Sequence, residues 1–137
     1  MSDKELIKRT EEFHGHVGPF IVAGLKMGLL AMEKLDAEKY TGMKVVVETG
    51  TTPPISCIVD GIQMSTGCTL GKGNIEVLSN NKPTATFTKK SINQNIKITL
   101  KDKWLQAIAD VSKESMEELA EKVLKTSPEE LFKIENG

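Results

Sequence analysis

The most hydrophobic part of the chain is residues 20–35, where apolar residues occur on every side of a helical projection. This pattern is typical of a helix that is buried on all sides rather than amphipathic. The stretch is shorter than the roughly 20 apolar residues that a bilayer requires, and Lys26 lies near its middle. Gly24, Gly28 and Met32 share one face at four-residue spacing, so we expect a neighbouring helix or strand to approach that face closely.

Short runs of β-branched residues predict the strands that follow. Residues 43–48 (MKVVVE) form the clearest strand. Three more strands are predicted at residues 75–78, 84–88 and 95–100, and the alternation of apolar and polar residues in the last indicates one wet face. The Pro53-Pro54 pair excludes a helix until residue 55.

Capping residues and apolar periodicity predict the remaining helices. Ser2 or Asp3 would cap a helix through residue 12, and Ser56 would cap one at residues 57–66. Further helices are predicted from residue 102, at residues 114–125 and at 128–132, the last opened by a capping box at 127–130. This order of elements is typical of an α+β domain with a mostly antiparallel sheet packed against helices.

Length and composition narrow the classes of function. The 137 residues suit one domain, residues 1–137. A net charge of -1 indicates no polyelectrolyte partner, and 4% aromatic residues are too few for a base-stacking surface, so nucleic acid is not expected as a ligand. The N-terminal residues lack the apolar segment of a signal peptide, so we expect a cytoplasmic protein without membrane contact.

The two cysteines are too few for a disulfide framework and are expected to be reduced in the cytoplasm. If Ser56 is the N-cap, Cys57 stands in the first helical turn, where the helix dipole favours a thiolate with a pKa below that of a free cysteine. Asp60 shares that face, so the pair could ligate a metal or act as nucleophile and base. The alternative is a buried small residue and an aspartate that only complements the dipole. Cys68 is expected to support packing.

The only two histidines, His14 and His16, stand in a turn flanked by Gly15 and by Gly18-Pro19. On an extended segment this spacing would point both rings to one side, which suits metal ligation. The alternative is two loop histidines bonded to the backbone. Imidazole together with a thiolate suits zinc or a similar transition metal.

A second glycine-rich loop, GCTLGKG, follows the predicted helix at residues 57–66. Its glycine spacing is one residue short of a Walker A motif, Gly73 replaces the Ser or Thr that binds magnesium, and a strand follows. The loop is therefore not a nucleotide-hydrolysing loop. It is either an anion-binding nest, with Lys72 offering charge to a phosphate or carboxylate, or a structural turn.

Two motifs together resemble the FmdE family of formylmethanofuran dehydrogenase proteins. These are FHGH-x-G-P at residues 13–19 and C-x-x-D-G-I-Q-x-x-T-G-C-T-L-G-K-G-N at 57–74, followed by KPTATF at 82–87. The resemblance implies an α+β core that pairs as a homodimer, with a metal-binding pocket near the dimer interface. It also implies one-carbon, methanogenesis-type metabolism in archaea or anaerobic bacteria, beside a molybdenum or tungsten formylmethanofuran dehydrogenase.

The resemblance assigns roles to individual residues of this chain. The implied metal ligands are His14, His16 and Cys57; the implied catalytic residues are Asp60 and Cys57; the implied cofactor-binding residues are Thr66, Cys68 and Lys72. The sequence departs from the family pattern at Gly18, where many members have a cysteine. It also contains no paired CxxC motifs of a C-terminal zinc ribbon, so it corresponds to the core domain.

Three functions are compatible with these residues. The first is a metal-dependent accessory protein or enzyme, with one transition metal, most simply zinc, bound through Cys57 and at least one of His14 and His16. The second is a non-catalytic cofactor- or anion-binding module, and the third is a structural component of a larger complex. We expect a homodimer, because the helix at residues 20–35 is apolar on every side and Gly24 and Gly28 suit close approach.

Overall fold

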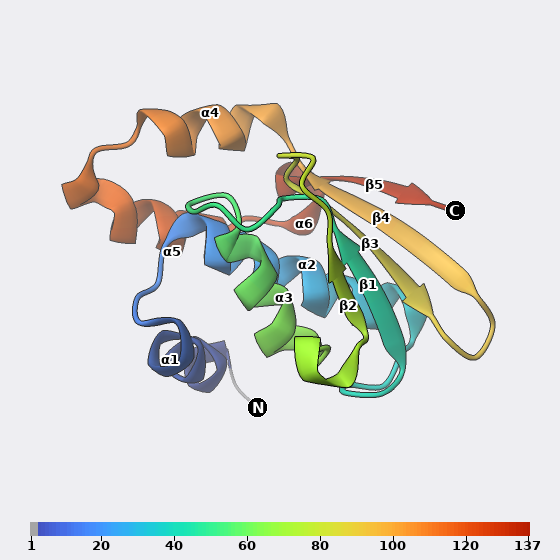
Figure 1. Cartoon of the computed structure of the whole chain (residues 1–137). Coiled ribbons are helices and arrows are strands. Elements are labelled where there is room, and N and C mark those ends of the chain that lie inside the picture. Colours follow the sequence, from blue (N-terminus) through green and yellow to red (C-terminus); the bar gives the residue numbers. More distant parts are fainter. Residues whose placement is uncertain (1–2) are drawn as a thin grey trace.

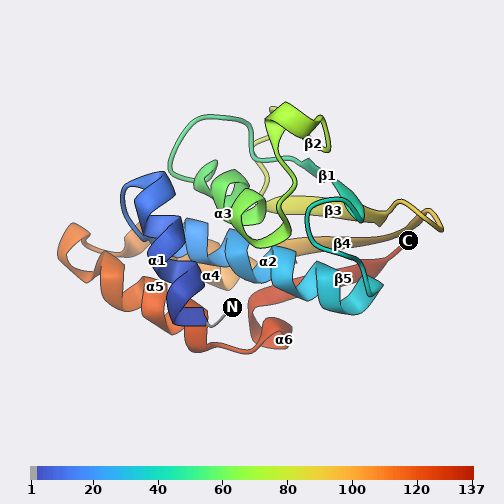
Figure 2. The ribbon, with the colours of Figure 1, turned by 90° about the horizontal axis from the view of Figure 1, so that it is seen from below.

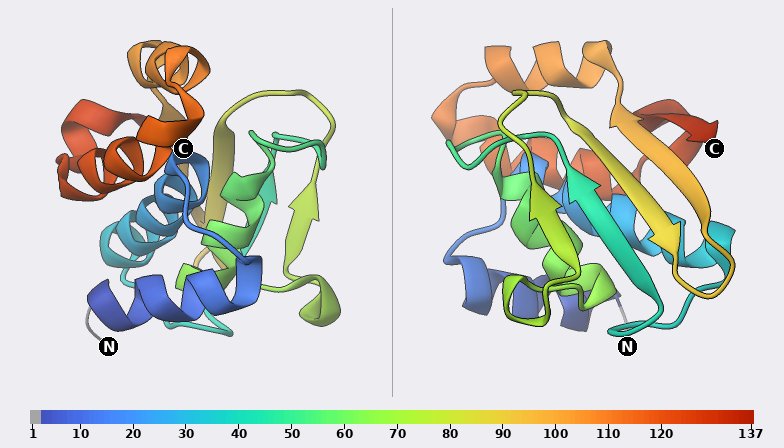
Figure 3. Two further views of the ribbon diagram at one scale, coloured as in Figure 1. Left: turned by 90° about the vertical axis from the view of Figure 1, so that its left-hand side faces the viewer. Right: turned by 45° about the vertical axis from the view of Figure 1, so that its right-hand side comes forward.

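The most hydrophobic stretch of the sequence, residues 20–35, lies in the central helix α2, Pro19–Leu35. Twelve residues of this helix are buried. The computed structural model describes residues 3–137, and in it the helices gather on one side of a five-stranded sheet (Figures 1 and 3). Pro19 occupies the first helical turn, as predicted, and Asp36 ends the helix in a left-handed conformation. The helix contacts the sheet, α3 and α5 directly.

The remaining elements follow the predicted order with one addition. The other α-helices are α1 (Asp3–His14), α3 (Cys57–Thr66), α4 (Asp102–Asp110), α5 (Met116–Lys125) and α6 (Pro128–Leu131). Two short 3-10 turns are η1 (Leu70–Lys72) and η2 (Lys113–Ser115). The strands are β1 (Met43–Val47), β2 (Ile75–Val77), β3 (Thr84–Lys89), β4 (Gln94–Leu100) and β5 (Phe132–Asn136). None of the described helices combines the length and hydrophobicity that a membrane span requires.

The strand order in the sheet is β2-β1-β3-β4-β5. Strands β1 and β2 pair in parallel, and the other three neighbouring pairs are antiparallel. The chain is therefore an α+β protein with a mostly antiparallel sheet packed against helices, which confirms the predicted fold class.

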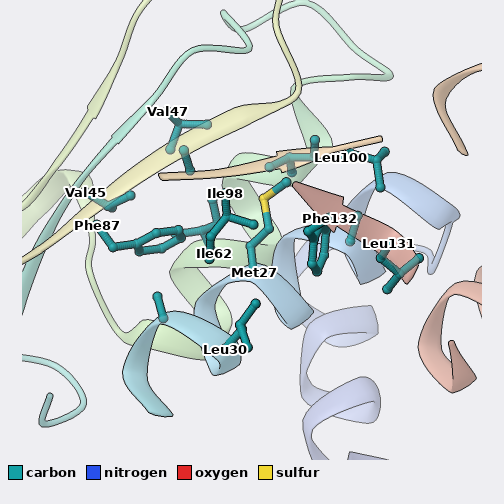
Figure 4. Packing of buried hydrophobic residues seen from close by; sticks show 14 of the residues in the cluster. Met27, Leu30, Val45, Val47, Ile62, Phe87, Ile98, Leu100, Leu131 and Phe132 are labelled. Atoms are coloured by element: carbon teal, nitrogen blue, oxygen red, sulfur yellow. The ribbon is translucent and has the colours of Figure 1, made fainter. Parts of the chain in front are cut away.

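The core lies between the sheet and the helices α2 and α3. Alternate residues of the central strands point into it, as the period of a strand requires. Met27 and Leu30 from α2 and Ile62 from α3 point toward Phe87 and Ile98 of the sheet (Figure 4). The C-terminal segment completes this core, because Leu131 and Phe132 are 0% and 2% exposed.

Glycines let the backbones of α2 and α3 approach each other, which confirms the close approach predicted for the Gly24 and Gly28 face. A Cβ added at Gly24 would lie 2.2 Å from the carbonyl oxygen of Ile58, and one at Gly61 would lie 2.2 Å from that of Ile21. One at Gly28 would meet the side chain of Ser65. The small residues of α2 are therefore used within the chain, so they give no support to the predicted homodimer.

Lys26 lies on the other side of α2, where it holds the C-terminal end of α5. Its ammonium donates to the carbonyl oxygens of Val123 (3.2 Å), Leu124 (2.8 Å) and Thr126. The last carbonyl groups of a helix have no partners within it, and a cation there also complements the helix dipole. Burial lowers the pKa of Lys26, and the charge of Asp3 opposes that shift.

Three local predictions were wrong or incomplete. Strand β5 was not predicted, and the last helix, which was expected to run through Phe132, ends at Leu131 instead. The predicted caps Ser56 and Ser127 make no side-chain capping hydrogen bond, and Ser56 itself has helical dihedral angles. The first helix runs on to His14 rather than ending at residue 12. Of its two proposed caps, Asp3 is the first residue of the helix and Ser2 lies outside the described residues.

Candidate functional site

The two histidines flank the end of α1 rather than lying on one extended segment. His14 is the last residue of the helix, and Gly15 leaves it with a φ of +97° while its N–H donates to the carbonyl oxygen of Glu11 at 2.7 Å. A left-handed φ of this kind favours glycine. The turn brings the His16 ring against His14, with 4.6 Å between the ring centroids and the planes 68° apart.

His14 is held by a carboxylate on α3. Its Nδ1 lies 2.6 Å from Oδ2 of Asp60, so the Nδ1–H donates to the carboxylate. Gln63 donates to the other carboxylate oxygen of Asp60 at 3.2 Å. The Nε2 atom of His14 is buried and has no hydrogen-bond partner within residues 3–137. In a neutral imidazole fixed in this way, Nε2 carries a lone pair that a metal can take.

Cys57 begins α3 but does not have the low pKa that was predicted for it. The N–H groups of Cys57, Ile58 and Val59 already donate to the carbonyl oxygens of the preceding turn, at 3.1, 3.2 and 2.9 Å. These three donors are therefore not available to favour a thiolate. Burial raises the pKa of the Cys57 thiol, and the neighbouring charge of Asp60 raises it further.

His16 and Cys57 both line a cavity of about 1020 Å³. Most of its wall is apolar, from the start of α2 and from α4 and α5. Carboxylates stand around it, and they belong to Asp3, Glu11, Glu117 and Glu121. A cavity of this size is large enough for an organic ligand or cofactor. His14 contacts His16 rather than lining the cavity itself.

The predicted metal ligands are of the chemical types that bind zinc, but their side chains are not arranged around a common point. Imidazole, thiolate and carboxylate are the groups that zinc prefers, and His14 is oriented by Asp60 as metal-bound histidines are. Within residues 3–137, however, no three His, Cys, Asp or Glu side chains stand close enough together to hold a metal ion. Binding of a metal ion here would therefore require that a side chain move, or that a further ligand come from another molecule.

Gly18 stands at the position where many members of the family that this sequence resembles have a cysteine. The residues around Gly18 show where the thiol of such a cysteine would lie. The backbone at Gly18 is extended, with φ -118° and ψ 177°, so any residue is tolerated. A Cβ added there would lie 3.8 Å from both Cε1 and Nδ1 of His16. A thiol at this position would therefore stand beside the His16 ring.

Thr66 and Cys68, which the resemblance assigned to cofactor binding, face the core and are each 1% exposed. The Thr66 hydroxyl donates to the carbonyl oxygen of Ile62 at 2.6 Å and accepts the N–H of Cys68 at 3.1 Å. The Cys68 thiol donates to the carbonyl oxygen of Met43 at 3.5 Å. Both side chains are buried and bonded within the turn after α3, so this arrangement gives their assignment to cofactor binding no support and agrees with the packing role expected of Cys68.

Lys72 lies apart from the histidines and Cys57. It lines a smaller cavity of about 220 Å³ at the C-terminal end of α3, together with Arg9, Lys39 and Tyr40. These three residues were missed in the sequence because they belong to no motif and lie in separate segments from Lys72. Gln63 was also missed, although its motif position three residues after Asp60 placed both side chains on one face of α3.

The fold and these residues define a small α+β protein with a histidine–carboxylate pair beside a large cavity. Residues 13–133 match the family described as FmdE, molybdenum formylmethanofuran dehydrogenase operon. The chain therefore belongs to the FmdE family.

Two relatives show how far the likeness extends. A protein of Archaeoglobus fulgidus described as a probable S-adenosyl-L-methionine-binding protein is 36% identical over 91 residues, which is 62% of this chain and 24% of that protein. The chain thus spans about a quarter of the length of this curated relative. The crystal structure of a tungsten formylmethanofuran dehydrogenase FmdE-like protein from Syntrophus aciditrophicus superposes with a TM-score of 0.71 at 19% identity. The superposition covers 98% of this chain and 71% of the crystallised chain, and it shows the same fold.

Proposed function

We propose that this FmdE-family protein is a metal-binding accessory protein or enzyme that works in one-carbon metabolism with a formylmethanofuran dehydrogenase. The proposed metal is a transition metal, most simply zinc, held by Cys57, His14 and His16. Asp60 positions His14 and acts as the acid–base group. The family description and the carboxylate-bound histidine support this proposal.

The observation that carries the proposal is the state of the His14 ring. One ring nitrogen is bonded to Asp60 at 2.6 Å, and the other is buried without a partner among residues 3–137. An unpaired buried polar atom costs free energy, about 1–3 kcal/mol, unless something occupies its lone pair. A metal ion on Nε2 would remove this cost, and the carboxylate on Nδ1 would make the imidazole a better ligand.

A bound zinc ion would supply a Lewis acid, or an activated water at neutral pH, beside the large cavity. The chain itself would provide the surroundings of that chemistry. The apolar walls from α2 and α5 would exclude water from a bound ligand. Asp60 would keep the His14 ring in one tautomer, with the proton on Nδ1.

Metal content tests the proposal directly. Elemental analysis of anaerobically purified protein should give about one transition metal per chain, and added zinc should raise the melting temperature of metal-free protein. Cys57→Ser should weaken zinc binding most, followed by His14→Ala and His16→Ala, and Asp60→Asn should weaken it about 10–100-fold through the orientation of His14. Binding should fall as the pH drops, because protons compete for the same lone pairs.

Cys68→Ser is the matched control for Cys57→Ser, because Cys68 is buried against the backbone of Met43. It should leave zinc affinity unchanged. Zinc that neither binds wild-type protein nor raises its melting temperature would refute the metal centre. Equal losses in the Cys57 and Cys68 variants would refute the assigned ligand.

Gly18→Cys offers a test by gain of affinity. The extended backbone accepts cysteine, and the new thiol would stand beside the His16 ring. We expect tighter zinc binding than in wild type, measured by competition with a chelator. Gly18→Ser places a weaker ligand in the same position and serves as the control.

The second candidate function is binding of an organic cofactor in the large cavity. The Archaeoglobus relative is described as a probable S-adenosyl-L-methionine-binding protein, and this molecule carries a positively charged sulfonium. The cavity has a volume of about 1020 Å³, and its charged lining has an excess of carboxylates, four against two ammonium groups: Asp3, Glu11, Glu117 and Glu121 against Lys4 and Lys113. Carboxylates near the ligand would favour the sulfonium over its neutral product.

Calorimetry with a matched pair of ligands tests this second function. S-adenosylmethionine should bind more tightly than S-adenosylhomocysteine, which lacks the sulfonium charge. Glu117→Gln should reduce that preference, while Glu118→Gln, on the same helix but outside the cavity, should keep it. Absence of saturable binding by either ligand would exclude this function and leave the metal centre untouched.

We further propose that the protein works in the cytoplasm as a homodimer within or beside the dehydrogenase complex. The support for a partner on the histidine side is Phe13, which is 57% exposed immediately before His14. Aromatic side chains are enriched at protein interfaces, and burial of this exposed ring against a second copy would be favourable.

A further inference from the structure

The smaller cavity, at the C-terminal end of α3, is lined by three cations and, among the described residues, by no carboxylate. Arg9 comes from α1, Lys39 from the turn after α2, and Lys72 from η1. None of the three takes part in an ion pair within residues 3–137. Because the whole chain has a net charge of -1, a wall of three cations is not explained by composition. Arg9 and Lys72 are exposed, so these side chains are free to turn toward an anion bound in the cavity.

Tyr40 also lines this cavity and lies near two of these cations. The residue is 53% exposed, and the ammonium groups of Lys39 and Lys72 each lie 5.1 Å from its ring centroid. This distance is within the range of a cation–π interaction. Both ammonium groups therefore lie close to one aromatic ring in the wall of the cavity.

The backbone of Tyr40 is strained, which suggests that its position has a purpose beyond packing. Its φ is +75°, a left-handed conformation that is rare for a bulky residue. The N–H of Tyr40 donates to the carbonyl oxygen of Thr66 at 2.8 Å, and its own carbonyl accepts from Lys72 at 3.3 Å and Asn74 at 3.2 Å. Gly67 lies against the ring, and a Cβ there would be 2.3 Å from it. Strain of this kind is concentrated at functional sites.

A neutral donor completes the wall. The Thr69 hydroxyl accepts the N–H of Lys72 at 3.3 Å, which leaves the hydroxyl proton able to donate. The volume of about 220 Å³ is below the usual range for drug-sized ligands and suits a small anion with few other atoms. Three cations match the charge of a dianion better than that of a single carboxylate.

We infer that this second cavity binds a phosphoryl dianion, either free phosphate or the phosphate group of a small metabolite. Arg9, Lys39 and Lys72 provide the charge, the Thr69 hydroxyl provides a hydrogen bond, and the Tyr40 ring provides a flat surface for the group attached to the phosphate. Arginine and lysine are the usual side chains for phosphate, and an aromatic face suits a planar substituent. The site is separate from His14 and Cys57, so it does not depend on the proposed metal centre.

Amide NMR titration with inorganic phosphate at constant ionic strength, adjusted with sodium chloride, tests the inference. Phosphate should give saturable shifts at Tyr40, Thr69 and Lys72. Lys72→Gln and Arg9→Gln should each weaken binding about tenfold, as expected for loss of a hydrogen bond to a charged group. Lys103→Gln removes a cation from α4, outside the cavity, and should leave the affinity unchanged.

Two esters distinguish a free anion from a carried phosphate group. Phenyl phosphate should bind more tightly than methyl phosphate if Tyr40 supports a planar substituent. Tyr40→Gly, which a φ of +75° accommodates, should abolish that difference without loss of thermal stability. Equal affinity of both esters and inorganic phosphate would assign the site to free phosphate. Shifts that do not saturate, or that are the same in the Lys72→Gln and Lys103→Gln variants, would overturn the inference.

Discussion

At the scale of single residues, the surroundings of Cys57 outweigh its position at the start of a helix. A first-turn cysteine is expected to be acidic because unpaired N–H groups and the helix dipole favour its thiolate. In α3 those N–H groups already donate to Pro54, Ile55 and Ser56. Burial and Asp60 then raise the pKa of the thiol. The metal-free protein should therefore hold Cys57 protonated at neutral pH.

Removal of the Asp60 charge should make Cys57 more reactive in metal-free protein. Asp60→Asn should lower the pKa of Cys57 and speed its labelling by iodoacetamide near neutral pH, because a neutral amide no longer opposes the thiolate. The measurement is labelling rate against pH in a Cys68→Ala background, with a small free thiol as reference. Wild-type Cys57 that reacts faster than the reference would contradict the raised pKa.

The raised pKa of Cys57 also predicts how the stability of the metal-free protein changes with pH. The pKa of Cys57 is higher in the folded than in the unfolded protein, so its stabilising contribution is complete below the unfolded pKa. That contribution is lost as the pH rises through the folded pKa. The loss of stability of metal-free protein on the alkaline side should accordingly be smaller in Cys57→Ala, as measured by urea denaturation over a pH series.

Lys26 shows how a charged residue can belong to a buried helix. The apolar pattern of residues 20–35 left no role for a lysine near the middle, yet its ammonium satisfies three carbonyl groups at the end of α5. Lys26→Met should lower the free energy of unfolding by about 1.5–3 kcal/mol, the range for hydrogen bonds to a charged group. Urea denaturation measures this loss. Lys34→Met, an exposed position on the same helix, should change stability little, and equal effects of the two variants would count against the capping role.

At the scale of elements, the contact between α2 and α3 depends on glycine. Added methyl groups at Gly24 and Gly61 would meet backbone carbonyl oxygens at 2.2 Å, which no side-chain movement can relieve. Gly24→Ala and Gly61→Ala should therefore each destabilise the protein by about 1–3 kcal/mol or prevent folding. Gly71→Ala is the control, because none of the described residues lies within 4 Å of its added Cβ. Thermal melts that show equal effects at the three positions would contradict this packing.

Local sequence patterns correctly predicted the elements whose boundaries are marked by residues within or beside them. Pro19 marked the start of α2, and the apolar run that follows it marked the helix as buried. The boundaries of α3, Cys57–Thr66, were correct even though the Ser56 cap was wrong, because the preceding turn bonds the first N–H groups instead. Strand β5 was missed because it follows α6 directly and because its two apolar residues, Phe132 and Ile134, are too few for a period. Its partner β4 lies more than thirty residues away in the sequence.

The same distinction applies to the candidate site: contacts within one helix were predictable from the sequence, and contacts between distant segments were not. Motif spacing brought Cys57 and Asp60 together correctly, since both lie on one helix. It could not show that Asp60 binds His14, because this contact spans 46 residues and depends on how α1 packs against α3. Tyr40 could not be predicted as a site residue from the sequence. Its left-handed backbone is accompanied by hydrogen bonds to Thr66, Lys72 and Asn74, which form only in the folded chain.

At the scale of the whole molecule, α3 joins two sites of different character. Near its start, Asp60 holds His14 beside the large cavity, and near its end the chain turns into the cationic cavity at Lys72. Gln63 belongs to both, because it lines the smaller cavity and donates to Asp60 at 3.2 Å. Because Gln63 contacts both sites, a substitution of Gln63 would alter both of them.

Exposed apolar residues occur in several regions of the surface, and two of them provide a comparison of candidate faces for a second copy. Phe13 is 57% exposed at the end of α1, beside the histidine turn, while Ile92 is 61% exposed in the turn between β3 and β4. These two regions lie at opposite ends of the molecule (Figures 1 and 2). Two exposed residues of similar size therefore allow the faces to be compared by the same substitution.

The proposed homodimer should depend on the histidine face. Light scattering should give twice the chain mass of 15.0 kDa for wild type at micromolar concentration. Phe13→Glu should shift the protein toward the monomer, because a charge at a buried interface costs free energy that the exposed monomer does not lose. Ile92→Glu should leave the dimer intact, and circular dichroism should show that both variants are folded. Monomeric wild type would refute the dimer, and dissociation by Ile92→Glu alone would place the interface at the hairpin end of the sheet instead.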